Sequence, residues 1–320
     1  MNVSIKLFKI SKCIILNNYH HLHYQVTSNN KKGYIKINFI YYVVKGLALT
    51  IGLNFVDPTH YAGWDGQLSA CEYDAEDMTD IAKSKGFEVQ KLLTKTATSE
   101  NVENGISKAA KKLESGDIFL LSYSGHGGKL PDKNSDEVDQ TDETWCLYDR
   151  QLVDDELNNY LAQFTKGVRI LVFSDSCHSG TVTRAIAANK NIDQMNSNID
   201  NQGKKYRFAP KNVIARTYKN NKTQYDKILT NHNLKEAEDK VKGSVILISG
   251  CQDNQYSQDG EFNGLFTSNL LDVWKEGTFN GSYKRLHKDI VGQMPPDQTP
   301  NYYLVGTLDK KFEKQIPFTI

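Results

Sequence analysis

Cysteine is scarce in this sequence, and its few positions exclude two classes of protein. The chain has five cysteines among 320 residues, and no two of them form a Cys-x-x-Cys pair. An odd number of widely spaced cysteines argues against a disulfide framework and against a structural zinc site, and it is typical of a reducing compartment. We therefore expect a cytoplasmic protein.

Long hydrophobic runs and an excess of charge of one sign are also missing. No apolar stretch reaches the roughly 18 residues of a membrane helix. Lysine plus arginine (39) balance aspartate plus glutamate (38), for a net charge of +1. A balanced chain has no general electrostatic reason to bind nucleic acid or an anionic membrane, so we expect neither as a partner. There is no Gly-x-Ser-x-Gly elbow and no phosphate-binding P-loop, which leaves serine-hydrolase and nucleotide-hydrolase functions without support.

From residue 47 onward, short apolar runs alternate with helical patterns. The runs predict six strands, at 47–53, 87–93, 117–123, 168–173, 244–249 and 302–306. Strand–helix–strand repetition predicts an α/β fold with a mostly parallel six-stranded sheet and helices on both faces.

Composition divides the chain into four segments. Residues 1–43 show no sustained helical or strand period, so we predict an extension outside the fold, which an upstream start site would explain. Residues 44–183 and 243–320 carry the alternating pattern and are expected to complete one domain. Residues 184–242 form a basic, Asn/Lys-rich insertion, expected to be loop-like with some helix at 233–241.

Two glycine-framed polar clusters come directly after two predicted strands. Ser124-Gly-His-Gly127 follows one strand, and Asp175-Ser-Cys-His-Ser-Gly180 follows another. Ligands of open parallel sheets bind beyond the carboxyl ends of the strands, so neighbouring strands would place His126 and Cys177 at one crevice. An imidazole helps to ionise a thiol and makes it a nucleophile. The pair predicts a cysteine hydrolase.

Each of these residues also has a structural interpretation. A single cysteine at a strand end is usually a small buried hydrophobe, and a single histidine is usually a hydrogen-bonded structural residue. His178 is a competing base, but adjacent residues rarely point at one atom. The joint placement of both motifs favours a dyad of Cys177 and His126.

These motifs resemble those of metacaspases and bacterial caspase-like peptidases. The segments Leu68–Ala75, Ser249–Asp253 and Gly264–Thr267 are also similar to that family, over roughly residues 47–306 in all. The resemblance implies a caspase-like fold and cysteine endopeptidase activity through an acyl-enzyme. It further implies that His126 is the base, that Cys177 is the nucleophile, and that the Gly127 and Cys177 amides form the oxyanion hole.

The charged residues near the two motifs predict which substrate side chain the pocket prefers. A pocket for a basic side chain should contain carboxylates, and a pocket for aspartate should contain arginine. No arginine other than Arg184 lies close in sequence to either motif. The resemblance implies a pocket lined by Cys71, Asp74, Ser124 and Asp175. We therefore expect cleavage after Arg or Lys, although Asp74 would also suit a helix N-cap and Asp175 a turn.

Calcium is the expected metal, and no organic cofactor is expected. The resemblance implies calcium ligands at Asp142, Asp154 and Asp155. The last two residues would also suit the N-terminus of a helix, where the helix dipole favours negative charge.

The basic insertion contains peptide bonds that follow Arg or Lys, which the expected enzyme would cleave. Self-cleavage there would follow basic residues, namely Lys204, Lys205, Arg207 and Arg216; alternatively the insertion is a solvated loop. Polypeptide substrates and a monomeric state are expected. The alternatives are a caspase-like scaffold with little turnover, or another acyl transfer by the same dyad.

Overall fold

The chain divides into two compact units, Met1–Val44 and Lys45–Ile320. A computed structural model describes the backbone of residues 22–29 and 34–41, and describes in full residues 43–131, 133, 141–176, 198–200, 203–234, 236–252 and 255–320. In the first unit, β1 (Leu22–Asn29) and β2 (Tyr34–Tyr41) pair as an antiparallel hairpin. The expectation of no strand pattern before residue 44 was therefore wrong. Residues 35–39 do alternate apolar and polar side chains, the period of a strand.

A six-stranded sheet forms the centre of the second unit. Its order is β11 (Asn301–Gly306), β10 (Ser244–Ser249), β9 (Arg169–Asp175), β5 (Ile118–Ser124), β3 (Gly46–Gly52) and β4 (Glu88–Leu93). All neighbours are parallel except β10 and β11. Both β5 and β10 are buried along their whole length, which explains why their sequences are almost continuously apolar. The predicted mostly parallel, six-stranded sheet is confirmed.

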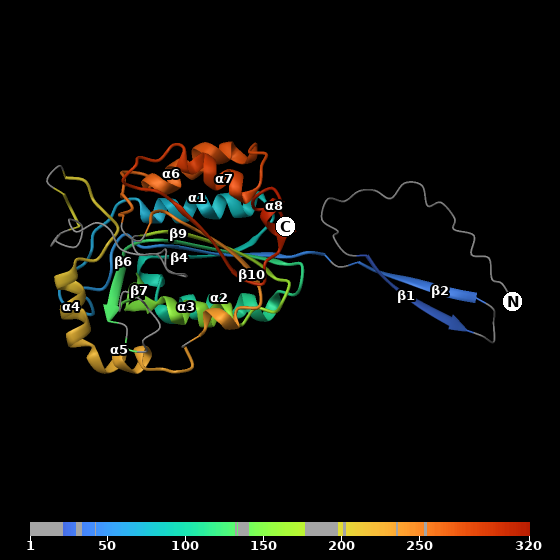
Figure 1. The fold of residues 1–320 in the computed structure, drawn as a ribbon, viewed down its shortest axis with the longest axis horizontal. Coiled ribbons are helices and arrows are strands. Elements are labelled where there is room, and N and C mark those ends of the chain that lie inside the picture. The colour runs from blue at the N-terminus through green and yellow to red at the C-terminus, as the bar shows by residue number, and fades with distance from the viewer. Residues whose placement is uncertain are drawn as a thin grey trace. The chain divides into compact units, whose positions relative to one another are not determined.

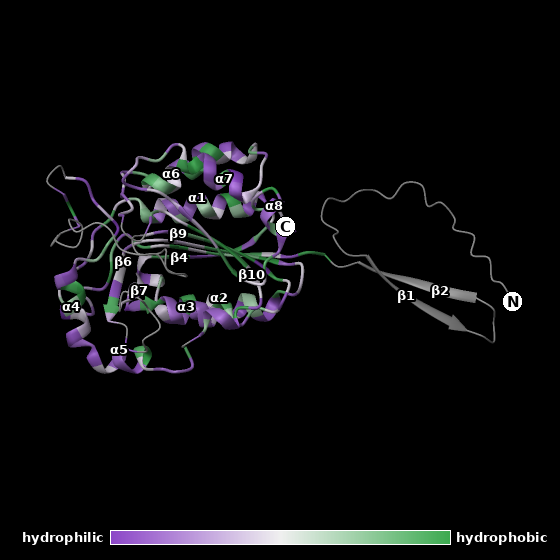
Figure 2. Cartoon of the chain, viewed as in Figure 1, coloured by the Kyte–Doolittle hydropathy of each residue, from purple (hydrophilic) through white to green (hydrophobic). Residues whose placement is uncertain are grey.

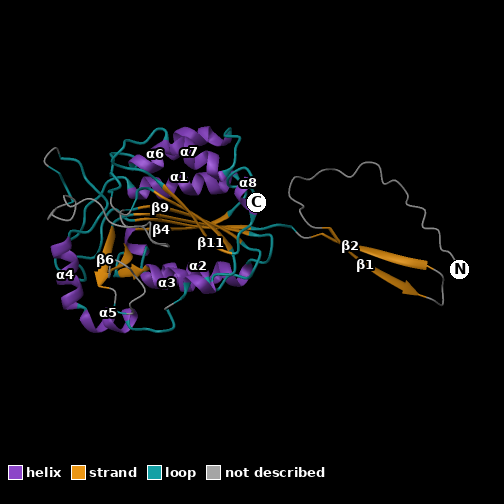
Figure 3. Ribbon diagram, in the orientation of Figure 1, coloured by secondary structure: helices purple, strands orange, loops and turns teal. Residues whose placement is uncertain are grey.

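Helices cover both faces of this sheet (Figures 1 and 3). On one face lie α1 (Cys71–Ser84), α6 (Leu265–Trp274) and α7 (Tyr283–Val291), and on the other lie α2 (Ser99–Lys112) and α3 (Asp154–Leu161). A short α8 (Lys310–Lys314) follows β11. The sheet strands carry most of the hydrophobic colour in Figure 2, and the helices show polar outer faces. Within the described ranges, no helix is long and apolar enough to cross a bilayer.

A small second sheet and two helices extend the edge of the unit near the expected site. The second sheet has the order β6 (Gly127–Pro131), β7 (Thr141–Cys146) and β8 (Gln151–Val153), all antiparallel. The insertion contributes α4 (Lys211–Asn220) and α5 (Lys222–Leu229). The expectation of a loop with helix near 233–241 was wrong, because only a 3₁₀ turn at Glu238–Lys240 forms there. Apolar side chains of α4 and α5 instead pack against the second sheet, in a cluster that includes Leu130, Val153, Ile214, Tyr225 and Leu229.

Candidate active site

The two strands that precede the polar motifs are direct neighbours. β5 and β9 pair in parallel, and Ser124 lies opposite Asp175 at their carboxyl ends. His126 therefore follows Ser124 at the edge of the sheet where ligands of parallel sheets bind. Cys177 lies outside the described residues, and Asp175 and Ser176 lead the chain towards it.

His126 is a buried, neutral imidazole. Its Nε2 lies 2.9 Å from the carbonyl oxygen of Gly66; a carbonyl only accepts, so Nε2 carries the proton and Nδ1 keeps a lone pair. Nδ1 is buried and has no hydrogen-bond partner within the described part of the chain. Burial lowers the pKa of His126 to about 4, although the Gly66 carbonyl opposes the fall. At neutral pH this ring is a proton acceptor through Nδ1.

Neighbouring groups fix the position of this ring. The Tyr123 hydroxyl and the Cys146 amide both donate to the His126 carbonyl oxygen, at 2.7 and 2.8 Å. The Trp64 ring packs 4.8 Å from the imidazole, centroid to centroid. Gly66 has φ +58°, a conformation that favours glycine, and a Cβ there would lie 3.0 Å from the imidazole carbon. These contacts orient the imidazole before any substrate binds.

Beside the histidine, a fully buried arginine lies among three carboxylates. The Arg207 guanidinium contacts Asp74 at 2.7 Å, Asp175 at 2.8 Å and Asp259 at 3.0 Å. It also donates to the Ser124 hydroxyl at 2.8 Å. The Arg207 side chain is 0% exposed, and none of the three carboxylates is more than 3% exposed. Buried charges need partners of this kind, and here the negative charges outnumber the positive one.

The charges in this cluster depend on one another. Burial by itself would lower the pKa of Arg207, but the carboxylates of Asp175, Asp74 and Asp259 hold it well above its ordinary value. Burial raises the pKa of Asp175, and the guanidinium opposes that rise. Burial also raises the pKa of Cys71 well above its ordinary value, so Cys71 is a neutral thiol rather than a nucleophile. Arg207 therefore stays protonated, and its charge favours the ionised form of Asp175.

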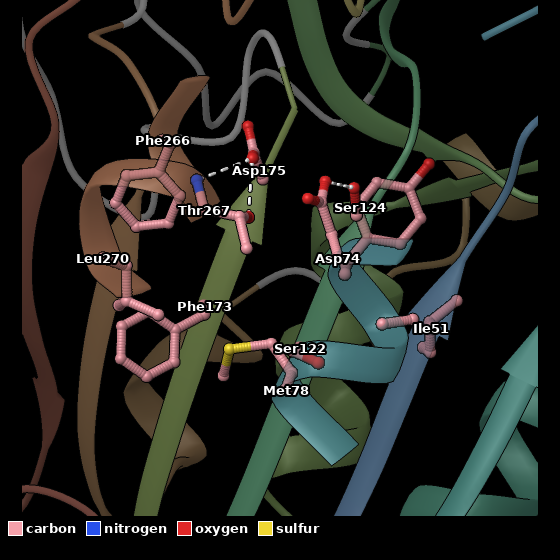
Figure 4. A pocket seen from close by; sticks show the side chains of 12 residues that line it. Ile51, Asp74, Met78, Ser122, Ser124, Phe173, Asp175, Phe266, Thr267 and Leu270 are labelled. Carbon is pink, nitrogen blue, oxygen red and sulfur yellow. Dashed lines mark hydrogen bonds between the residues drawn. The ribbon is translucent and has the colours of Figure 1, made fainter. Parts of the chain in front are cut away.

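The carboxylates are held in place by groups from several elements. Asp175 accepts from the Thr267 hydroxyl at 2.9 Å and from its amide at 3.3 Å. Asp74 accepts from the Ser124 hydroxyl at 2.6 Å and from the Gly264 amide at 3.0 Å. Figure 4 shows both carboxyl groups at one end of a small cavity. The other end of that cavity is apolar and includes Met78, Phe173 and Leu270.

The backbone around Arg207 passes through the site and forms isolated β-bridges with its neighbours, between Phe208 and Gly127 and between Tyr206 and Gln258. The Gly127 amide donates to the Arg207 carbonyl oxygen at 3.0 Å, and the Arg207 amide donates to the Ser257 carbonyl at 2.9 Å. On either side, the Asp259 amide donates to the Lys205 carbonyl, and the Ala209 amide donates to the Gly127 carbonyl. The insertion therefore lies along the sheet edge in the way that an extended peptide adds to a strand.

The structure brings together all four residues expected in the pocket. Cys71, Asp74, Ser124 and Asp175 surround one guanidinium, although they come from α1, β5 and β9. The N-cap alternative for Asp74 was wrong, because α1 begins at Cys71 and has Ala70 as its N-cap. Asp175 ends β9 rather than forming a turn.

Sequence reasoning missed two residues of the site. Asp259 completes the carboxylate cluster, and Gly66 orients the imidazole. Neither stands in a recognisable motif. The Asp259-Gly260 pair reads only as a turn signal, and Gly66 follows an aspartate in polar text. Both reach the site through long-range packing, which no local pattern records.

The residues expected to bind calcium are placed apart from this cluster. Asp142 lies in β7, and Asp154 and Asp155 begin α3. Across the described ranges, no group of three or more His, Cys, Asp or Glu residues could hold a metal ion. Calcium binding by the three aspartates stays a prediction, and we derive no catalytic step from it.

Comparisons with known proteins agree with this geometry. The family model described as Caspase domain matches residues 45–317. Metacaspase-1 of Schizosaccharomyces pombe is 26% identical over 281 residues, covering 79% of this chain and 64% of that protein. Metacaspase-1B of Aspergillus fumigatus is 26% identical over 283 residues, covering 77% and 66%. The chain thus spans about two thirds of the length of these curated relatives.

A solved structure extends the comparison. A crystal structure of a Geobacter sulfurreducens protein is 53% identical and has a TM-score of 0.74, covering 86% of this chain and 98% of that one. With the sheet order, the paired strand ends and a family match over residues 45–317, the chain belongs to the caspase domain family, with metacaspases among its relatives.

Proposed function

We propose that this protein is a cysteine endopeptidase that cleaves polypeptides after Arg or Lys. One observation carries the proposal: three buried carboxylates enclose an arginine side chain directly beside a neutral His126 and the Gly127 amide. Such a pocket complements a long basic side chain and repels an acidic one. The monomeric state and the cytoplasmic location belong to the same proposal. The few, widely spaced cysteines support the location, and the resemblance to metacaspases supports the monomer.

The proposed mechanism uses the Cys177–His126 dyad. His126 Nδ1 accepts the thiol proton, and the Cys177 sulfur attacks the carbonyl carbon of the residue in the pocket. The amides of Gly127 and Cys177 stabilise the resulting oxyanion. His126 then donates its proton to the leaving amine, an acyl-enzyme remains, and water activated by the same imidazole hydrolyses it.

The position of Arg207 allows a rival interpretation, in which it is a wall of the pocket and selects aspartate. Its backbone argues against this. The Arg207 carbonyl accepts from Gly127, and the Arg207 amide donates to Ser257, as a substrate residue would do. If the whole segment moved away, Asp74, Asp175 and Asp259 would remain and the pocket would be acidic.

Hydrolysis of matched fluorogenic peptides ending in Arg, Lys or Asp tests the proposal. We expect turnover of the Arg and Lys peptides by the wild type and none by Cys177→Ala. Asp175→Asn should lower kcat/KM for the Arg peptide by about 100-fold, because it removes one partner of a buried charge pair. Asp272→Asn, at an exposed aspartate of α6, is the matched control and should leave the rate unchanged. Preference for the Asp peptide would contradict the pocket assignment.

The same assay separates the remaining alternatives. Activity that is lost on adding a chelator and restored by calcium would support the calcium prediction at Asp142, Asp154 and Asp155; unchanged activity would contradict it. Folded wild type that turns over no peptide, and whose Cys177 a peptidyl electrophile does not label, would be a scaffold rather than an enzyme.

A further inference from the structure

We propose that Trp64 is a positioning residue of this active site, whose indole shields the His126 imidazole from water and so keeps it a neutral proton acceptor in mildly acidic solution. The inference rests on the proposed function, because it gives His126 the role of the catalytic base. Trp64 belongs to neither of the two polar motifs, and it reaches the imidazole from a turn that follows β3.

The indole of Trp64 packs directly on the imidazole of His126. The ring centroids are 4.8 Å apart and the ring planes meet at 53°. His126 is buried, whereas Trp64 is half-buried and keeps part of its surface in solvent. The indole therefore stands between one side of the imidazole and the solvent, and its removal would open that side to water.

Gly66 allows the two rings to come this close. A Cβ on Gly66 would lie 2.7 and 2.9 Å from two carbons of the indole and 3.0 Å from a carbon of the imidazole. Only a residue without a side chain leaves that space to the rings. The Gly66 carbonyl oxygen also accepts from Nε2 of His126 at 2.9 Å. One short segment thus holds the imidazole by a hydrogen bond and covers it with the side chain of Trp64.

The turn that carries Trp64 is fixed from below. The Trp64 amide donates to the Tyr61 carbonyl at 3.1 Å, and the Val56 amide donates to the Asp65 carbonyl at 2.9 Å, which closes the turn. The Tyr61 side chain is buried, and its hydroxyl donates to the Leu147 carbonyl at 2.8 Å. Trp64 packs on the same apolar cluster as Tyr61. The indole is therefore held over the imidazole by the fold of the turn.

Burial has the largest effect on the protonation of His126. It lowers the pKa of the imidazole from 6.5 to about 4, although the backbones of Gly66 and Phe208 oppose the fall. Burial acts in this direction because it disfavours the charged form of a histidine. A side chain that supplies part of the burial should supply part of the fall.

The other ionisable groups around the imidazole belong to other elements. Asp259 raises the pKa of the imidazole by its charge, and Arg207 lowers it. Tyr123 and Cys146, whose groups donate to the carbonyl of the histidine, stay neutral because burial raises the pKa of both. The turn that carries the indole has four ionisable residues, Asp57, His60, Tyr61 and Asp65. None of these groups is removed when the indole is replaced, so a change in the pKa of the imidazole measures the loss of cover.

Shielding should determine the acid side of the pH profile. A neutral imidazole must accept the thiol proton, so activity is lost below the pKa of His126. Without the indole, water would stabilise the imidazolium, and this pKa should rise from about 4 towards the ordinary 6.5. At about pH 5, roughly nine tenths of wild-type molecules would hold a neutral imidazole, against about a quarter once the pKa has risen to about 5.5.

The first experiment measures the pKa of His126 by NMR in the full chain with Cys177→Ala, where no turnover is needed. Histidine ring carbons are labelled and titrated from about pH 3.5 to about pH 8, and the signal is assigned by its absence in His126→Gln. Trp64→Ala, Trp64→Phe and Phe279→Ala are compared, and cooperative urea unfolding confirms that each variant is folded. Phe279→Ala is the matched control, because Phe279 is a half-buried aromatic residue that packs on Trp274, outside the site.

We expect Trp64→Ala to raise the pKa of His126 by about 1 or more, because water then reaches the ring. Trp64→Phe, which keeps an aromatic cover, and Phe279→Ala should both leave this pKa within about 0.5 of the wild-type value. An unchanged pKa in Trp64→Ala, or an equal rise in Phe279→Ala, would overturn the inference and leave the proposed function standing.

Hydrolysis of the Arg peptide by chains that retain Cys177 is the second experiment. The ratio of kcat/KM at about pH 5 to that at about pH 8 should be about fourfold lower in Trp64→Ala than in wild type, and Trp64→Phe should resemble wild type. Identical pH profiles for wild type and Trp64→Ala would contradict the inference. Folded wild type that hydrolyses no peptide at any pH would instead overturn the proposed function, and the NMR titration would still decide whether Trp64 shields His126.

Discussion

At the scale of single residues, His126 shows how burial sets the protonation state of the proposed catalytic base. The ring is 1% exposed, and its Nε2 proton is committed to the Gly66 carbonyl. Its pKa falls from an ordinary 6.5 to about 4 in the folded chain. Between these values the unfolded chain binds the additional proton and the folded chain does not. Folding stability should therefore fall as the pH falls from 6.5 towards 4, and the slope should end below 4.

Replacement of this histidine should remove that pH dependence. In a Cys177→Ala background, which lacks the proposed nucleophile, we expect His126 to make the free energy of unfolding lower by roughly 2 kcal/mol at about pH 4.5 than at about pH 7. His126→Gln should lack this part of the change, and His232→Gln, at an exposed histidine, should retain it. Urea denaturation at the two pH values measures the difference. Equal pH dependence with and without His126 would contradict the assigned protonation state.

At the scale of elements, the contact between β3 and α1 positions one side of the pocket. A Cβ on Gly52 would lie 2.2 Å from the Cys71 carbonyl oxygen and 2.8 Å from the Ala75 Cβ, so the helix begins directly against the strand. Deeper in the same contact, the buried hydroxyls of Thr50 in β3 and Thr79 in α1 are hydrogen-bonded at 2.7 Å. Because Asp74 lies in the first turn of α1, this packing decides where its carboxylate lies.

Gly52→Ala should therefore reduce both stability and substrate binding. The added methyl group must push α1 away from β3, and overpacking of this kind costs about 1–3 kcal/mol. The displaced Asp74 should raise KM for the Arg peptide. Gly292→Ala is the matched control, since its Cβ would come no closer than 3.4 Å to its neighbours. Urea denaturation and peptide kinetics check both effects, and an unchanged KM would show that α1 does not position the pocket.

At the scale of the whole molecule, the active site is assembled by the sheet of the second unit. Asp74, Ser124, Asp175 and Asp259 are distributed along most of the domain and meet because β3, β5, β9 and β10 are adjacent. The insertion between β9 and β10 returns across the same edge and places Arg207 among them. The Lys45–Ile320 unit contains this sheet, its helices and its core.

Residues 44–320 should fold without the preceding segment. In the Cys177→Ala background, we expect the free energy of unfolding of this shortened chain to lie within about 0.5 kcal/mol of the full chain, as for changes outside a packed core. Urea denaturation of the two proteins makes the comparison. A shortened chain that aggregates or loses its cooperative transition would show that residues 1–43 belong to the fold.

The six strands, the mostly parallel sheet and the two motifs at strand ends could be predicted from the sequence by itself. The period of the apolar residues and the glycines at strand ends are local features of the sequence. The expectation of a basic preference came from carboxylates close to the motifs, from the scarcity of nearby arginine and from the family resemblance, and it stays a prediction. Tertiary structure alone decided that Asp259 joins the pocket, that Gly66 orients His126, and that Arg207 rather than Lys204, Lys205 or Arg216 fills the site. These contacts join residues that are far apart in the sequence. Arg207 and Asp259 are 52 positions apart, and Arg207 and Asp74 are 133 positions apart. Such pairs depend on strand order and close packing, for which a single sequence carries no local signal.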